Sequence, residues 1–456
     1  MASGPVLILL LILAIIFIIV GTAKVKMHPF IVLLVTGYGL GLLAGLSPEA
    51  TIQAITEGFG GTLRYIGIVI AAGTIIGAIL ERSGAARVMA ESVIRWVGRA
   101  RSVLAMSLTG AVVSIPVFCD SGYVVLSPLS RSLAAQSKQS LATYAVALSM
   151  GLYATHVFVP PTPGPIAAAG ELGADIGTVI LLGLVTTIPV IAATYLFARY
   201  MGRRIYIDPA HEPEAAPPSE AAETEAVEAE RPAAWKAFAP ILVPVLLIAV
   251  QSVAALPGRP FGEGAVYTVL RFLGNPNTAL LLGVFIAFMI VKKRGAIVYT
   301  DWVGAGLKEA GTIILITGAG GALGKVLQAT PLGAYLGETL APLGLGPLSI
   351  VLPFLIAATL KTALGSSTVA IITTASILAP LLDSLGLAAG LGPVLTTLAI
   401  GAGAMTVSHA NDSYFWVVGQ FSDMTVSQAY QLQTGGSAVA GVTGIVAVFL
   451  MSLFLL

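Results

Sequence analysis

Two long apolar runs in this chain, about 250 residues apart, are interrupted by polar and proline-rich residues in a similar way. The first breaks at Thr155-His156 and is followed by Pro160, Pro161, Pro163 and Pro165. The second breaks at Ser408-His409 and is followed by Asn411, Asp412 and Ser413. Polar side chains are costly in the hydrocarbon of a membrane, and proline cannot continue a helix. We therefore expect two transmembrane helices, 141–170 and 393–416, that unwind partway across the membrane.

A second kind of interruption lies about 35 to 45 residues before each of these breaks. The apolar region 103–137 contains Cys119-Asp120-Ser121-Gly122, and the apolar region 347–385 contains the run from Lys361 to Thr368. Backbone groups cannot be left unpaired in lipid, so we expect both regions to form re-entrant helical hairpins buried in protein. Broken apolar segments in two matching halves are typical of secondary transporters.

The composition is that of a membrane protein that crosses the lipid bilayer many times. The chain is 57% hydrophobic and 10% charged, whereas soluble proteins have roughly 25% charged residues. A net charge of +1 argues against nucleic acid as a partner. A single cysteine, Cys119, excludes an intrachain disulfide. The apolar segments long enough to span a membrane are 5–21, 29–46, 65–80, 141–158, 178–198, 238–256, 277–291, 310–327, 393–410 and 436–456.

The basic residues that flank these segments define an orientation, because cytoplasmic loops carry an excess of Lys and Arg. This orientation puts both termini outside, with the first hairpin entering from the cytoplasm and the second from outside. The segments 65–80 and 310–327 then run in opposite directions, and residues 73–80 match residues 320–327 in sequence. We therefore expect an all-α polytopic protein of two inverted-topology repeats, 1–207 and 235–456. A disordered acidic cytoplasmic linker, 208–234, joins them.

The interrupted segments contain the candidate substrate ligands. A helix that begins at mid-membrane presents unpaired N–H groups and the positive end of its dipole, which suit an anion. The hairpin residues that would receive a carboxylate and hydroxyl groups are Ser121, Gly122, Gly365, Ser366, Ser367 and Thr368. The residues of the broken spans that would contact hydroxyl groups are Thr162, Gly164, Asn411 and Ser413. The alternative is that these side chains only cap helices or form packing hydrogen bonds between them.

Three ionisable residues, Asp120, Lys361 and Asp412, fall at a depth where an unpaired charge is expensive. Lys361 could pair with either carboxylate, or contact a substrate carboxylate directly. Asp120 or Asp412 is the first choice for carrying a coupling proton. His156 and His409 are the second choice, because imidazole exchanges protons near neutral pH.

The sequence gives less support to other classes of function. A membrane metal hydrolase would need clustered ligands, and no H-x-x-x-H or C-x-x-C spacing occurs. No glycine-rich phosphate loop occurs either, which argues against an ATP-driven pump. We therefore expect no enzyme activity, no metal and no cofactor. A channel is a remaining alternative, because re-entrant hairpins also line channels.

At these motifs the chain resembles the gluconate permease family of the ion transporter superfamily. The matching stretches are Glu81–Ala85, Pro116–Ser127, Thr155–Pro165, Leu360–Val369 and Ser408–Trp416. The resemblance implies a multi-pass symporter of the bacterial inner membrane that carries gluconate or a related sugar acid with protons. It also implies inverted repeats around a central site, a homodimer and an elevator mechanism. Members that carry D-serine, glycerate or fructuronate leave the exact substrate open.

Overall fold

A computed structural model describes residues 4–98, 101–209, 232–254, 261–291, 295, 297–332, 335, 346–410 and 412–456. Within these ranges all regular structure is helical and no strand is present. Seven helices there are long and apolar enough to cross a membrane, or up to nine if each of two bent pairs is one span. The prediction of an all-α polytopic fold is therefore confirmed. Most of the expected linker, residues 210–231, and the candidate ligand Asn411 lie outside the described residues.

Most helices of the first half follow the apolar segments of the sequence, but α3 begins well before the segment 65–80 and α4 lies outside all of the segments. They are α1 (Gly4–Ile19), α2 (Pro29–Leu43), α3 (Pro48–Arg82), α4 (Ala85–Val97), α5 (Ser102–Val113), α6 (Cys119–Ser137), α7 (Leu141–Phe158), α8 (Pro163–Leu172) and α9 (Ile176–Arg204). Three of them, α2, α3 and α8, begin with proline. Its fixed backbone angle suits the first turn, where its missing N–H costs nothing.

The helices described in the second half of the chain complete the fold. They are α10 (Ala234–Ala254), α11 (Ala265–Leu273), α12 (Pro276–Ile290), α13 (Val303–Gln328), α15 (Val351–Leu364), α16 (Ser367–Leu378), α17 (Gly392–Met405), α18 (Ser413–Phe421), α19 (Val426–Ala429) and α20 (Gly435–Leu455). Single π-helical turns, Ile297–Trp302 and Tyr430–Thr434, lead into α13 and α20.

Two helical hairpins, α5–α6 and α15–α16, lie in the regions that carry polar interruptions. The second reverses direction at Gly365, whose φ of 80° lies in the left-handed region that glycine adopts without steric cost. Ser366 then caps α16, because its Oγ accepts a hydrogen bond from the Val369 N–H at 3.3 Å. Entry of the hairpins from opposite membrane sides stays a prediction.

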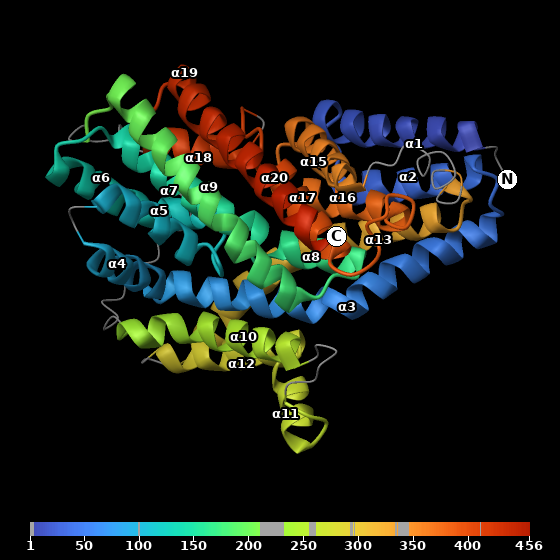
Figure 1. Cartoon of the computed structure of the whole chain (residues 1–456), viewed down its shortest axis with the longest axis horizontal. Helices are drawn as coiled ribbons and strands as arrows, with labels where there is room; N and C mark the ends of the chain where they lie inside the picture. Colours follow the sequence, from blue (N-terminus) through green and yellow to red (C-terminus); the bar gives the residue numbers. More distant parts are fainter. Residues whose placement is uncertain are drawn as a thin grey trace.

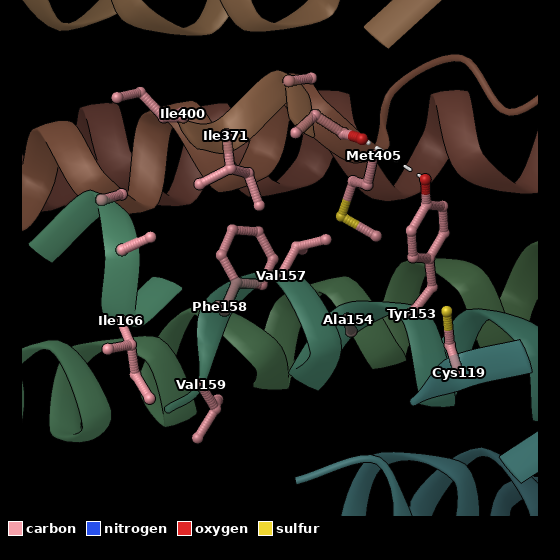
Figure 2. Close-up of a cluster of buried hydrophobic side chains, with 14 of the residues drawn as sticks. Cys119, Tyr153, Ala154, Val157, Phe158, Val159, Ile166, Ile371, Ile400 and Met405 are labelled. Carbon is pink, nitrogen blue, oxygen red and sulfur yellow. Dashed lines mark hydrogen bonds between the residues drawn. The ribbon is translucent and has the colours of Figure 1, made fainter. Parts of the chain in front are cut away.

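The centre of the molecule is formed by α7 and α17, in which every residue is buried. α7 ends at Phe158 and the chain resumes helix at Pro163, while α17 ends at Met405 and resumes at Ser413. Figure 2 shows Phe158 pointing from α7 towards Ile371 of α16. Close packing of this kind holds the broken ends of both helices against the α15–α16 hairpin.

The long helices α3 and α13 pack against each other through glycines. A Cβ built on Gly58 would meet the backbone of Gly321 and Ala322, and one built on Gly306 would meet the backbone at Ile75. Residues near the start of α3 therefore face the end of α13, and residues near the end of α3 face its start. The two helices are antiparallel. These helices carry the matching sequences 73–80 and 320–327. Their antiparallel packing is what an inverted repeat needs, and the repeat itself stays a prediction.

Large apolar side chains are exposed on the peripheral helices. Examples are Leu9 on α1, Ile188 on α9, Phe285 on α12 and Val446 on α20. Figure 1 shows α10 and α12 side by side next to α3 and α4, away from α5, α6 and α7. This apolar exterior fits a protein surrounded by lipid.

Candidate functional site

A buried ion pair joins the second hairpin to the second broken span. Nζ of Lys361, near the end of α15, lies 2.7 Å from Oδ2 of Asp412. The two side chains are 0% and 5% exposed. Lys361 Nζ also donates to the carbonyl oxygen of Gly365 at the hairpin turn. Of the two partners that the sequence allows for Lys361, the structure places Asp412 in the pair.

Further hydrogen bonds hold the Asp412 carboxylate in place. Its Oδ2 accepts from Ser408 Oγ at 2.6 Å, and its Oδ1 caps α18 by accepting from the Tyr414 N–H at 3.2 Å. Ser408 is in turn fixed by Ser437 of α20, whose Oγ accepts from the Ser408 N–H at 3.0 Å. A buried charge needs this degree of compensation, because an incompletely paired charge in the interior is strongly destabilising.

The first hairpin reaches the same region through the start of α6. Asp120 Oδ1 accepts from Ser413 Oγ at 3.3 Å, which joins α6 to the first residue of α18. Two other contacts join α6 to the residues that follow α18: the hydroxyls of Tyr123 and Ser422 are hydrogen-bonded, and Arg131 pairs with Asp423 at 2.7 Å. The Asp120 carboxylate has no ion pair among the described residues.

Two tyrosines connect the broken spans with the hairpin. The hydroxyl of Tyr153 on α7 lies 2.7 Å from Ser367 Oγ at the start of α16 and 3.4 Å from the carbonyl oxygen of Ala404. In Figure 2 this hydroxyl points across from α7 towards the segment that carries Met405. Tyr414 donates from its hydroxyl to the carbonyl oxygen of Ser149 on α7 at 2.9 Å. The starts of α6, α16 and α18 therefore meet beside α7.

The remaining candidate ligands divide into exposed and buried groups. Ser366 and Ser413 are exposed, and Asp120, Ser121 and Thr368 are partly buried. Gly122, Thr162, Gly164, Gly365 and Ser367 are buried. Thr162 donates to the carbonyl oxygen of Val159 at 2.7 Å, and Gly164 packs against Ile371 and Thr368. Among these candidates Ser366 and Ser413 therefore have the most accessible hydroxyls, and Asp120, Ser121 and Thr368 are partly accessible.

The two histidines lie in different surroundings. His156 is buried beside the ring of Phe118, and its Nδ1 has no hydrogen-bond partner. His409 is partly buried, and its Nε2 lies 2.8 Å from the carbonyl oxygen of Thr362. Among the described residues no group of three or more His, Cys, Asp or Glu side chains could hold a metal ion. The site is therefore built from hydroxyls, carboxylates, helix starts and one lysine.

A family model described as GntP family permease matches residues 6–454. The chain belongs to the GntP permease family. A gluconate permease from Pseudomonas aeruginosa is 34% identical, with 100% of this chain and 99% of the relative covered. The D-serine transporter DsdX from Escherichia coli O6:H1 is 32% identical, with 97% of each chain covered. An uncharacterized permease from Haemophilus influenzae is 36% identical over 91% of this chain and 85% of the relative.

Solved transporter structures share the fold of this GntP family permease. The YdaH transporter from Alcanivorax borkumensis matches with a TM-score of 0.66 at 17% identity, covering 94% of this chain and 99% of that one. MtrF from Neisseria gonorrhoeae matches with a TM-score of 0.64 at 14% identity, covering 95% and 96%. The protein is therefore a polytopic membrane transporter of the gluconate permease family, and the prediction that it is not an enzyme is confirmed.

Some residues of the site of this GntP family permease carry no clear signal in the sequence. Tyr153 and Tyr414 lie in apolar helices, where an aromatic residue is most simply interpreted as core. Only the packing of α7 against α16 and α18 shows that their hydroxyls join separate elements. Ser408 appears in the sequence as half of a hydroxyl–histidine pair, and its role as a donor to Asp412 depends on the unwound backbone between α17 and α18.

Proposed function

We propose that this transporter imports gluconate or a closely related sugar acid together with a proton across the bacterial inner membrane. The observation that carries the proposal is the meeting of three helix starts, α6, α16 and α18, around exposed hydroxyls and one buried lysine. Helix starts and hydroxyl groups suit a carboxylate with a hydroxylated chain. Ser121 and Ser366 to Thr368 then face the carboxylate, and Asn411, Ser413 and Thr162 face the hydroxyls. Lys361 serves as counter-ion or, after rearrangement, as a direct ligand.

The contacts of α3 and α13 support movement of the elevator type. Backbone carbonyls of the hairpins and breaks lie against glycines there: a Cβ on Gly73 would lie 3.0 Å from the Pro161 oxygen, and one on Gly324 would lie 3.0 Å from the Ser376 oxygen. A face without side chains offers little resistance to sliding. In this proposal the hairpins and broken helices move against the α3–α13 pair. The family resemblance is the support for a homodimer.

Counterflow of labelled gluconate in proteoliposomes tests the substrate class. Saturable exchange of gluconate is the expected result, because the site pairs anion-binding helix starts with several hydroxyls. A second candidate, D-serine, is favoured by the relative DsdX, which matches over nearly the whole chain. Exchange of D-serine without exchange of any sugar acid would move the substrate to that class. Uptake that never saturates would instead favour a channel.

Asp120 is the expected proton carrier, because Asp412 is already bound by Lys361, Ser408 and the start of α18. We expect Asp120→Asn to keep substrate counterflow and to lose accumulation driven by a pH gradient. In the wild type, a gradient of one pH unit across the membrane supports about tenfold accumulation of substrate when one proton is carried with each substrate molecule. Asp412→Asn is the matched comparison. If Asp120→Asn still accumulates substrate like the wild type, Asp412 is the next candidate, and if neither carboxylate is needed the histidines His156 and His409 follow. A sodium requirement without a pH response would reject proton coupling.

A further inference from the structure

A polar cavity of about 560 Å³ lies away from the cluster of Lys361 and Asp412. It is formed where α3, α13 and the end of α8 meet. Its lining residues are Thr56, Glu57, Gly58, Gly60, Gly61, Thr62, Arg64, Glu171, Gly321, Gly324, Lys325 and Gln328. A volume of several hundred Å³ is in the range of small-molecule sites. None of its lining residues is among the substrate ligands proposed above.

Two cations, Arg64 on α3 and Lys325 on α13, line the cavity together with the carboxylates of Glu57 and Glu171. Among the described residues, no ion pair includes either of them. A guanidinium and an ammonium that line one cavity and form no ion pair with its carboxylates leave N–H groups available to an anion. Arginine in particular can hold a carboxylate with two parallel hydrogen bonds.

The other lining groups suit hydroxyls rather than a second anionic group. Glu171 accepts from Thr62 Oγ1 at 2.6 Å, and Glu57 accepts from Gln53 at 2.8 Å. Both carboxylates keep further lone pairs that can accept from hydroxyl groups, and Gln328 can donate. The Thr56 hydroxyl donates to the Ile52 and Gln53 carbonyl oxygens and can still accept from a ligand. Glycine at position 321 is needed here, because a Cβ would collide with Thr62 Oγ1 and lie 2.9 Å from Glu171 Oε1. The cavity thus combines a cationic part with many hydroxyl partners.

Helix α8 connects this cavity to the proposed transport site. Its first turn packs against Thr368, because a Cβ on Gly164 would lie 3.8 Å from the Thr368 Cα. Its last turn carries Glu171 into the cavity. A ten-residue helix is about 15 Å long. The cavity is therefore about one helix length from the start of α16, too far for one small molecule to occupy both places.

We propose that this cavity is a second binding site for a polyhydroxy carboxylate, which the transported sugar acid occupies before or after the site at the hairpins. Arg64 and Lys325 hold the carboxylate, and Glu171, Thr62, Thr56 and Gln328 contact the hydroxyls. The inference rests on the proposed sugar-acid substrate. A staging site of this kind raises the local substrate concentration next to the transport site without taking part in the chemistry of coupling.

Transport kinetics in proteoliposomes test the site. We expect Arg64→Gln/Lys325→Gln to raise the KM for the sugar acid about tenfold or more, as the loss of charge-assisted hydrogen bonds predicts, with kcat nearly unchanged. The unchanged kcat also shows that the variant is folded. Lys308→Gln, an exposed change on α13 outside the cavity, is the matched control and keeps the wild-type KM. Glu49→Gln, an exposed change on α3 outside the cavity, controls for net charge. If KM falls in this variant by a factor similar to its rise in the double variant, general surface electrostatics explains both changes, and the proposal is overturned.

A direct labelling measurement completes the test. In a Cys119→Ala background, the sugar acid should slow thiol labelling of Gln328→Cys, and the Arg64→Gln/Lys325→Gln changes should abolish that protection. Vesicles of purely zwitterionic lipid exclude an anionic lipid headgroup as the occupant. Protection that requires anionic lipid, or an unaltered KM in the double variant, overturns the second site. If the wild type carries no sugar acid at all, the proposed function fails first, and that result is visible before any cavity variant is made.

Discussion

Lys361→Met is expected to lower the free energy of unfolding by about 3–5 kcal/mol and to abolish transport. Methionine has a similar length, so little volume is lost, but Asp412 is left as a buried carboxylate without its cation. Its remaining partners, Ser408 Oγ and the Tyr414 N–H, are neutral donors and replace only part of the lost interaction. Denaturant unfolding of the purified protein in mixed micelles measures the effect.

Two further variants control for this result. Arg87→Met removes one partner of the Arg87–Glu91 pair, whose side chains are 57% and 35% exposed. An exposed pair of this kind contributes about 0–1 kcal/mol, so little should change. Lys361→Met/Asp412→Asn removes both charges and should regain most of the lost stability. A Lys361→Met protein no less stable than Arg87→Met would contradict a buried, fully desolvated pair.

Gly77→Ala should reduce the transport rate at least tenfold in a protein that still folds. A Cβ at this position would collide with the carbonyl oxygen of Pro116 at the tip of the first hairpin. Either the hairpin tip or α3 must shift, and overpacking of this kind costs about 1–3 kcal/mol. The shift displaces Asp120 and Ser121, which follow the tip directly. Initial rates of counterflow, compared at equal amounts of reconstituted protein, measure the loss.

Gly67→Ala is the matched control on the same helix. Nothing lies within 4 Å of a Cβ built on Gly67. Both replacements gain a similar amount of helix propensity, about 1 kcal/mol, so that the difference between them reports the contact with Pro116. Equal rates for Gly67→Ala and Gly77→Ala would show that the hairpin tip does not depend on a close approach to α3.

The sequence was sufficient to predict the helical class and the positions of the polar interruptions. Proline, serine and aspartate inside apolar runs stand out, because lipid tolerates them only where protein satisfies their backbone and side chains. The family could be recognised from the same stretches, such as Leu360–Val369, and the match over residues 6–454 confirms it.

Contacts between segments far apart in the chain could not be predicted in this way. From the sequence, Asp120 and Asp412 are the two carboxylates expected at the membrane depth of Lys361. Which of them pairs with Lys361 depends on how the hairpin turn packs against the unwound backbone before α18. The link from Tyr153 to Ser367 joins residues more than 200 positions apart and has no local pattern. The cavity beside Glu171 arises only from the crossing of α3, α8 and α13.

Substrate protection of a cysteine at Ser366 tests the central proposal most directly. The only native cysteine, Cys119, is buried and can be replaced by alanine, while Ser366 is exposed at the start of α16. In Cys119→Ala/Ser366→Cys, the transported sugar acid at about ten times its Kd should slow maleimide labelling about tenfold. Ser427→Cys, exposed on α19, should label at the same rate with or without substrate. Unchanged labelling at position 366 during active transport would contradict a substrate site where the hairpins and broken helices meet.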